Sequence, residues 1–117
     1  MEGRDPAHDR QPQRRIEPRL GAAGVRGIDA SWYLPAMRRD ARAEYLEAHV
    51  PGAVYLDLST DLADLSAPVR NTIAAPAALA ELFAGAGIGT EHHVVVYDRL
   101  GGYSAGRIWW ALRYAGH

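Results

Sequence analysis

The stretch VVVYDRLGGYSAGRIWWALRYAGH, residues 94–117, decides the fold because it places a strand, a turn and a helix in immediate succession. Val94–Tyr97 is a continuous apolar run with β-branched residues, which is typical of a strand buried on both faces. The Gly-Gly pair at 101–102 then predicts a tight turn. We expect Ser104 to cap the helix that follows and Gly116 to end it.

Two segments have the apolar spacing of amphipathic helices. The spacing i, i+3, i+4, i+7 is met by Ala105, Ile108, Trp109 and Leu112, and again by Leu79, Leu82, Phe83 and Ala86. In the second helix Pro76 suits the first turn and Gly87 suits the position just after the end. At this spacing the adjacent Trp109 and Trp110 are expected to pack in a core or at a domain interface.

Shorter elements precede these helices. Val25–Ala30 predicts a buried strand with Asp29 near its carboxyl end, and Asp40–Ala48 predicts a short helix capped by Asp40. The Pro-Gly pair at 51–52 predicts a turn, and Val54–Leu58 a short strand. Strands alternating with helices imply right-handed crossovers, so we predict an α/β fold with a mostly parallel sheet flanked by helices.

Composition excludes several function classes. The chain has 117 residues, enough for one small domain, and its formal net charge of −1 favours neither nucleic acid nor an anionic membrane as partner. All 13 basic residues are Arg. The chain contains no Cys, which removes disulfides, thiolate metal sites and thiol catalysis together. No apolar run reaches the length of a membrane span.

Residues 1–24 form a polar, Pro- and Arg-rich segment that cannot bury enough apolar area to offset its ordering entropy. We therefore expect a disordered leader. The segment lacks the apolar region of a secretory signal, and its acidic residues argue against a transit peptide. The expected location is cytoplasmic.

His49 is the polar residue whose sequence context indicates a possible chemical role, and two interpretations of it stay open. It stands directly before a Val-Pro-Gly turn, with Asp40 nine residues upstream. A carboxylate that fixes the tautomer of a His gives a proton relay, provided that the nucleophile comes from elsewhere. In the alternative, His49 hydrogen-bonds the backbone of the turn and does no chemistry.

Neither a metal nor a cofactor is expected. His92 and His93 are adjacent, so in a strand they point to opposite faces and cannot easily bind one ion together. The glycine turn at 101–102 has the spacing of neither a phosphate loop nor a dinucleotide fingerprint.

Several blocks carry a specific resemblance. They are IDASWYLP at 28–35, RDARAEY at 39–45, HVPGAVYLD at 49–57 and SAGRIWWALRYAGH at 104–117. In this order they resemble the N-terminal domain of the two-domain sulfurtransferases, rhodanese (thiosulfate sulfurtransferase) and 3-mercaptopyruvate sulfurtransferase. The resemblance covers about residues 25–117, and the first two blocks look more like the mercaptopyruvate enzymes.

The resemblance implies a rhodanese-like fold and a protein of two domains, of which one carries the catalytic Cys. In the family, a Cys in the C-terminal domain accepts sulfur from thiosulfate or 3-mercaptopyruvate and passes it to cyanide or a thiol. The implied partners of this chain are thus a C-terminal rhodanese domain that supplies the Cys, and a small sulfur donor. The family histidine of the HxPGA motif and an upstream aspartate, proposed to relay protons with a serine of the active-site loop, correspond to His49 and Asp40.

The family pattern extends further in both directions, so residues 25–117 are predicted to be a partial N-terminal rhodanese-like domain, incomplete at both ends. We expect no sulfurtransferase activity from the chain alone, and poor folding because a strand of the parallel sheet is absent. The alternatives are a non-catalytic binding module and an inactive truncated product. A phosphatase of the same fold is excluded because its CX5R loop requires Cys.

Overall fold

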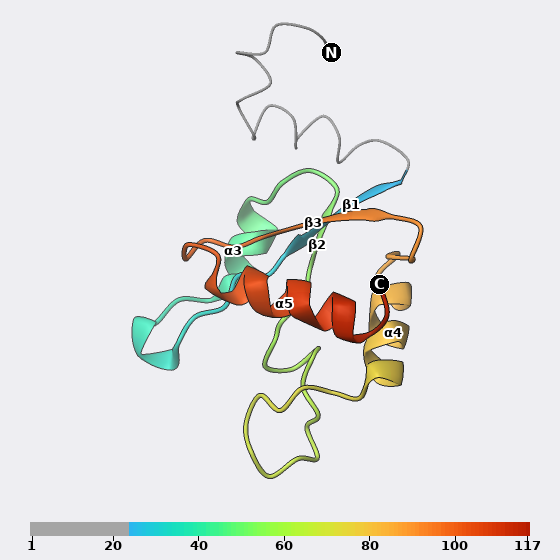
Figure 1. Ribbon diagram of the computed structural model, residues 1–117. Helices are drawn as coiled ribbons and strands as arrows, with labels where there is room; N and C mark the ends of the chain where they lie inside the picture. The colour runs from blue at the N-terminus through green and yellow to red at the C-terminus, as the bar shows by residue number, and fades with distance from the viewer. Residues whose placement is uncertain (1–23) are drawn as a thin grey trace, which may run out of the picture.

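A computed structural model describes residues 24–117 (Figure 1). The predicted leader, residues 1–24, lies outside the described residues except for Gly24. The elements in chain order are β1 (Val25–Asp29), the 3-10 helix η1 (Pro35–Met37), α3 (Ala41–Glu47), β2 (Ala53–Tyr55), α4 (Pro76–Gly85), β3 (His93–Tyr97) and α5 (Tyr103–Tyr114). None of the helices within residues 24–117 is long and apolar enough to cross a bilayer.

The three strands form a parallel sheet in the order β2-β1-β3, as the alternation of strands and helices predicts. β1 lies in the centre, and its last residue, Asp29, pairs with Tyr55 on one side and Tyr97 on the other. Because the strands are parallel, their carboxyl ends meet at one edge of the sheet. This is the edge where open α/β folds bind ligands.

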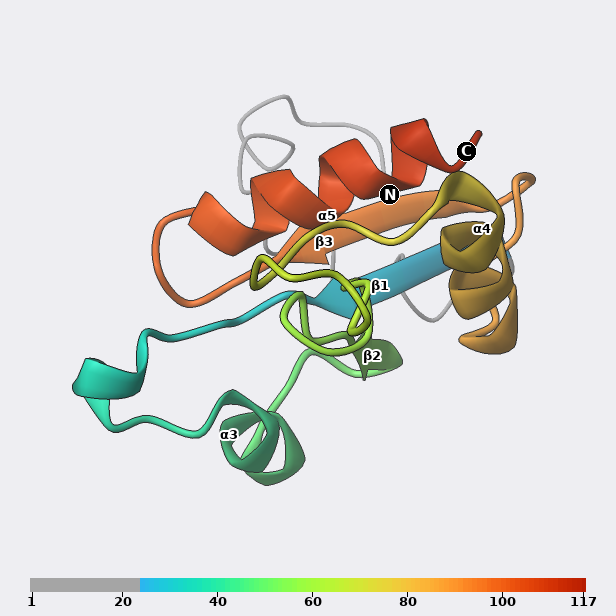
Figure 2. The same ribbon diagram turned by 90° about the horizontal axis from the view of Figure 1, so that it is seen from below.

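Figure 2 shows α5 lying along β3, with α4 near the C-terminal end of α5, and α3 on the other side of the sheet. The core fills the space between the sheet and the α4–α5 layer. Its buried members include Ile28, Leu62, Leu79, Phe83, Ile108, Ala111 and Leu112. The two predicted helical stripes therefore supply much of the core, since Leu79 and Phe83 come from one and Ile108 and Leu112 from the other.

The predicted ends of α3 and α4 are confirmed. Asp40 caps α3, with its carboxylate accepting the backbone N–H of Ala43 at 3.0 Å. α4 begins at Pro76 and is closed by Gly87, whose φ is +85°. The N–H of Ile88 donates to the carbonyl of Phe83 at 2.9 Å, which completes a Schellman motif at the end of α4.

The prediction that Ser104 caps α5 is wrong. Ser104 is the second helical residue and is buried, and the preceding N-cap position is Gly102, at φ +95°. The carboxylate of Asp98 takes over the capping role. It accepts the backbone N–H groups of Leu100, Gly102 and Ala105 at 2.7–2.9 Å. Burial would raise the pKa of Asp98, but these N–H bonds outweigh it and the pKa falls below its usual value.

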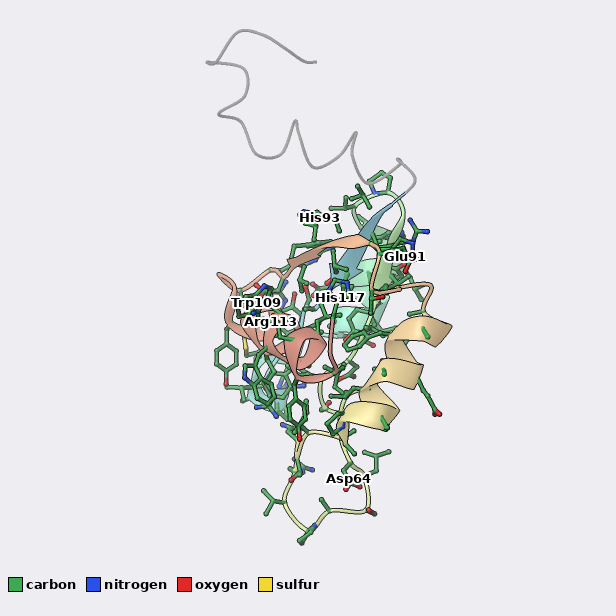
Figure 3. All side chains as sticks on the ribbon, turned by 45° about the vertical axis from the view of Figure 1, so that its right-hand side comes forward. Asp64, Glu91, His93, Trp109, Arg113 and His117 are labelled. Atoms are coloured by element: carbon green, nitrogen blue, oxygen red, sulfur yellow. The ribbon has the colours of Figure 1, made fainter. Side chains whose placement is uncertain are left out.

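Two further expectations are corrected, and a third is narrowed. β2 covers Ala53–Tyr55 rather than 54–58. β3 is half-buried instead of buried on both faces, because it is an edge strand of the described sheet. Trp109 and Trp110 are 55% and 50% exposed, which excludes the core for both, and packing at a domain interface stays a prediction. Figure 3 shows Trp109 beside Arg113, whose guanidinium lies 5.2 Å from the ring centroid.

Candidate functional site

His49 follows the last turn of α3 and is held by that turn. Its Nδ1 lies 2.7 Å from the carbonyl oxygen of Tyr45. A carbonyl can only accept, so Nδ1 carries the proton and Nε2 is the nitrogen that can take one up. The ring also stacks on the Tyr45 ring, with centroids 3.9 Å apart and planes at 18°. His49 thus satisfies the backbone-bonded interpretation, yet it keeps one exposed nitrogen for chemistry.

Tyr45 is itself fixed from the other side. Its hydroxyl donates to the carbonyl of Ala53 at 2.5 Å, at the start of β2. Its ring also contacts the Tyr55 ring at a centroid distance of 5.7 Å. The stacked pair of Tyr45 and His49 is therefore tied to the sheet as well as to α3.

Asp40 and His49 are not brought together. Asp40 lies at the N-terminal end of α3, where one carboxylate oxygen accepts the N–H of Ala43. His49 lies beyond the C-terminal end of the same helix. A helix of this length separates the two side chains by about 10 Å along its axis. The group that fixes the His49 tautomer is the Tyr45 carbonyl, and a role for Asp40 in proton transfer stays a prediction without a direct contact.

Glu44 is the carboxylate that gathers the charged groups of this region. It accepts the Tyr33 hydroxyl at 2.7 Å and both nitrogens of an Arg39 fork, at 2.9 and 3.0 Å. Arg99, from the turn after β3, lies 4.0 Å from the same carboxylate. The hydrogen bonds from Arg39 and then Tyr33 lower the pKa of Glu44 to about 2. Burial, and then the bond to Glu44, raise the pKa of Tyr33.

The backbone on both sides of His49 is bonded to the end of β3. The N–H of Val50 donates to the Tyr97 hydroxyl at 3.0 Å, and Arg99 donates to the carbonyl of Ala48. Burial raises the pKa of Tyr97 to about 12, so its hydroxyl is neutral at physiological pH. The last residue of β3, Tyr97, and Arg99 in the turn after it therefore hold the segment that carries His49.

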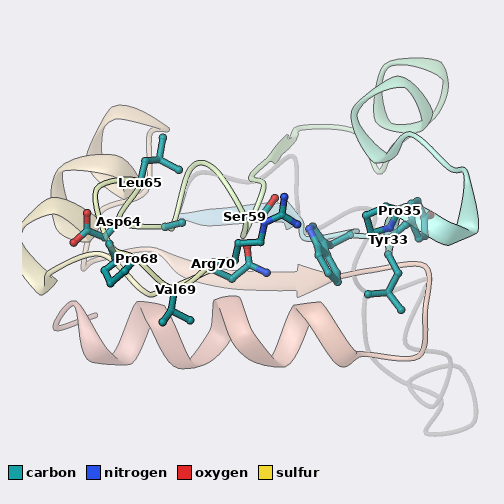
Figure 4. A pocket seen from close by; sticks show the side chains of 13 residues that line it. Tyr33, Pro35, Ser59, Asp64, Leu65, Pro68, Val69 and Arg70 are labelled. Atoms are coloured by element: carbon teal, nitrogen blue, oxygen red, sulfur yellow. The ribbon is translucent and has the colours of Figure 1, made fainter.

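A groove opens at the carboxyl edge of the sheet, between the segment that follows β1 and the loop that follows β2 (Figure 4). Its volume is about 540 Å³. It is lined by Trp32, Tyr33, Leu34, Pro35, Ser59, Ala63, Asp64, Leu65, Ala67, Pro68, Val69, Arg70 and Asn71. In Figure 4, Arg70 and Ser59 lie in the middle of this carboxyl-edge groove, with Leu65 and Val69 on one side.

A smaller cavity of about 200 Å³ adjoins the groove at Trp32, and Tyr103 and Arg107 of α5 line it. Arg107 donates to the carbonyl of Asn71 at 2.6 Å and so joins α5 to the loop after β2. No motif in the sequence marks Trp32, Tyr103, Arg70 or Arg107 as a functional residue. The available signal was position, since Trp32 and Tyr103 follow the carboxyl ends of two parallel strands.

The electrostatics of the two cavities favour an anion with apolar surroundings. Arg70 and Arg107 are the arginines of their linings, and Asp64 is the one acid. Hydrogen bonds from Ser66 lower the pKa of Asp64, so it is ionised at neutral pH. Within residues 24–117 no group of three or more His, Asp or Glu side chains could hold a metal ion.

The sequence profile of the rhodanese-like domain matches residues 37–117, more than half of the chain. The chain belongs to the rhodanese-like domain family. Bovine (Bos taurus) thiosulfate sulfurtransferase is 44% identical to it over 96 residues, which cover 80% of this chain and 32% of the relative. Human (Homo sapiens) 3-mercaptopyruvate sulfurtransferase is 42% identical over 92 residues, or 77% of this chain and 31% of the relative.

The solved structures agree. This rhodanese-like domain superimposes on the 3-mercaptopyruvate sulfurtransferase SseA of Escherichia coli with a TM-score of 0.71 at 31% identity. The match covers 86% of this chain and 38% of SseA. The α/β fold and the family predicted from the sequence blocks are both confirmed. The chain spans about a third of the length of the relatives that it matches.

Proposed function

We propose that this rhodanese-like domain is the non-catalytic N-terminal part of a sulfurtransferase that moves sulfur from thiosulfate or 3-mercaptopyruvate to cyanide or a thiol. A C-terminal rhodanese domain would supply the persulfide-forming Cys. One observation carries the proposal: relatives that are about 40% identical over some 80% of this chain are thiosulfate and 3-mercaptopyruvate sulfurtransferases, while this chain contains no Cys. A thiolate is needed because it is both nucleophile and leaving group for sulfur.

The carboxyl-edge groove supports a role as one wall of the reaction site. Trp32 and Tyr103 offer apolar surface, and Arg70 and Arg107 offer cations for the anionic sulfur donor. Leu65 is largely exposed there, as would suit a surface that a second domain covers.

His49 supports the proton-transfer part of the proposal. When a thiolate takes sulfur from 3-mercaptopyruvate, the carbon–sulfur bond breaks and the pyruvate carbon that leaves must gain a proton. His49 has a fixed tautomer with Nε2 exposed, so it can pass a proton to a group in the active-site loop of the partner domain. Asp40 stays in the proposal as the acid that caps α3 and so stabilises the helix that carries Tyr45.

The test is complementation. The chain is mixed at increasing concentration with a separately produced C-terminal rhodanese domain of a two-domain relative, and sulfur transfer from each donor to cyanide is followed as thiocyanate. We expect no thiocyanate from the chain alone and a rate that saturates with its concentration in the mixture. In the mixture, His49→Gln is expected to lower the rate with 3-mercaptopyruvate about a hundredfold.

The alternative is a non-catalytic binding module. Its specific support is the same exposed groove, which could dock a partner without chemistry. Binding of the Cys-bearing domain with no gain in thiocyanate formation at any ratio would favour this alternative. A cytoplasmic location stays a prediction from the sequence, and cell fractionation tests it.

A further inference from the structure

The position of His49 depends on contacts that neither the sequence pattern nor the predicted Asp40 partnership supplies. Its ring is exposed and is bonded locally only to Tyr45, four residues away. The segment around it links α3 to β2 and contains a Pro-Gly turn. Local bonds alone would let this segment move relative to the carboxyl edge of the sheet, where the reaction is proposed.

Two long-range hydrogen bonds prevent that movement. Tyr97 is 47 residues from Val50 in sequence and accepts its N–H, while Arg99 is 51 residues from Ala48 and donates to its carbonyl. These bonds fall on the two peptide groups that flank His49. The acceptor side chain, Tyr97, ends β3, the strand that pairs directly with β1, and the donor side chain, Arg99, lies in the turn that follows β3.

Glu44 adds an electrostatic anchor to this arrangement. It lies on α3, one turn before the C-cap residue Ala48, and its carboxylate oxygen is 4.0 Å from the Arg99 guanidinium. Arg39 and Tyr33 bond the same carboxylate and keep it ionised, so the charge that attracts Arg99 is permanent above acidic pH. Arg99 thereby contacts an acid within α3 and the carbonyl of Ala48, the residue that caps the end of α3.

We propose that Tyr97, Arg99 and Glu44 are positioning residues that clamp the backbone on both sides of His49 and so hold its imidazole toward the partner domain. This inference rests on the proposed function for its catalytic meaning. The clamp itself is a property of this chain, and it can be tested without any sulfur transfer.

The first test measures His49 by NMR in the full chain alone. Nitrogen-15 shifts of the ring report the tautomer, and the proton shifts of the ring report stacking on Tyr45. Tyr97→Phe removes one hydroxyl and Arg99→Met keeps an apolar stem without the donor. In both variants we expect the Nδ1–H population to fall and the stacking shift to be reduced.

Matched controls separate the clamp from general destabilisation. Tyr55→Phe removes a strand-end hydroxyl that bonds the carbonyl of Ser31, and Arg42→Met removes a charge of α3 that lies over the Tyr55 ring. Neither contacts residues 48–50 through these groups, so the His49 signals are expected to stay as in the wild type. Arg99→Lys, which keeps a donor and a charge, is expected to restore part of the wild-type shift.

The second test uses the complemented enzyme. Tyr97→Phe and Arg99→Met are each expected to lower kcat roughly tenfold with 3-mercaptopyruvate, with a smaller change in KM, because misplacement of a proton-transfer group slows the chemical step. His49 signals identical to wild type in both variants would overturn the clamp, whatever the activity. If the two substitutions alter the His49 signals but no mixture with the C-terminal domain forms thiocyanate, the clamp is supported and the proposed function is rejected.

Discussion

Glu44 shows how much of the local structure one carboxylate can organise. It joins Tyr33 after β1, Arg39 before α3 and Arg99 after β3. The side chain is only partly exposed at 24%, and its principal partner forms a two-pronged bond. Such bidentate pairs are stronger and more directional than single surface ion pairs.

The first prediction concerns acid stability. The pKa of Glu44 falls from 4.5 to about 2 on folding, so its contribution to stability is present above pH 4.5 and is lost as pH drops toward 2. The free energy of unfolding of Glu44→Gln is therefore expected to fall less between pH 5 and pH 2.5 than that of the wild type. Urea unfolding at a series of pH values measures this, with Glu81→Gln on α4 as the charge control.

The second prediction concerns two buried atoms at the carboxyl end of β1. The Asp29 Oδ2 and Ser31 Oγ atoms have no hydrogen-bond partner among the described residues, although Asp29 Oδ1 accepts the Ser31 N–H at 2.9 Å. Ser31→Ala removes an unsatisfied buried hydroxyl and leaves that backbone bond intact. We expect it to raise the free energy of unfolding by about 1 kcal/mol.

Ser104→Ala is the matched control for this substitution. Ser104 is equally buried, but its hydroxyl donates to Asp98 at 3.3 Å. The Ser104→Ala substitution removes this bond and is expected to lower the free energy of unfolding by about 1 kcal/mol. Thermal or urea unfolding measures whether the two substitutions change the free energy of unfolding in opposite directions. A loss of stability in Ser31→Ala would show that the Ser31 hydroxyl is not an unsatisfied buried group.

At the scale of elements, local signals were sufficient wherever the stabilising group is adjacent in sequence. Asp40 caps α3, Pro76 begins α4 and Gly87 closes it, and each of these features was predicted from residue type and position. The failures involve groups that come from further away. Asp98 caps α5 across a turn from five residues before the helix, a distance at which no short motif signals it.

Burial was also harder to predict than periodicity. Trp109 meets the i, i+4 spacing with Ala105 but is half exposed, because the buried stripe of α5 runs through Ser104, Ile108 and Ala111 instead. The half-burial of β3 follows from strand order, which periodicity does not contain. In the site, His49 was found from sequence, whereas Glu44 and Arg99 depend on contacts that only the fold creates.

The third prediction compares two glycines, Gly85 at the end of α4 and Gly87 just beyond it. A Cβ at Gly85 or at Gly87 would meet no atom within 4 Å, so neither substitution causes a clash. Gly85 is helical, whereas Gly87 has φ +85°. Gly85→Ala is expected to raise the free energy of unfolding by about 1 kcal/mol, because Ala loses less backbone entropy in a helix. Gly87→Ala is expected to lower the free energy of unfolding by about 1 kcal/mol, because a Cβ strains the left-handed backbone. Equal effects in thermal unfolding would contradict a backbone origin.

At the scale of the whole molecule, the proposed chemistry lies at one edge. Because all three strands are parallel, Trp32 and Tyr103 both follow carboxyl ends, and the carboxyl-edge groove opens beside them. The His49 segment precedes β2, and the bond from the Val50 N–H to Tyr97 ties it to the end of β3. The opposite edge carries the strand starts. Substitutions at the groove are therefore expected to affect partner binding more than stability.

The fourth prediction tests that separation. Val69 is 69% exposed in the groove, so Val69→Asp is expected to change stability little. Its affinity for the Cys-bearing domain, measured by calorimetry, is expected to fall about tenfold or more if the groove is buried on docking. Leu46→Asp is the control, since Leu46 is 73% exposed on α3 and does not line the groove. Equal losses of affinity in both variants would place the docking surface elsewhere.

The capping of α5 by Asp98 has a consequence for the whole edge. The N–H groups at this helix start face a negative charge that is covalently part of the chain, and the pKa of Asp98 keeps that charge in place at neutral pH. The turn after β3 thus carries its own counter-ion. Its shape is expected to be the same in dilute buffer and in concentrated sulfate, which leaves the neighbouring arginines as the groups that respond to anions in solution.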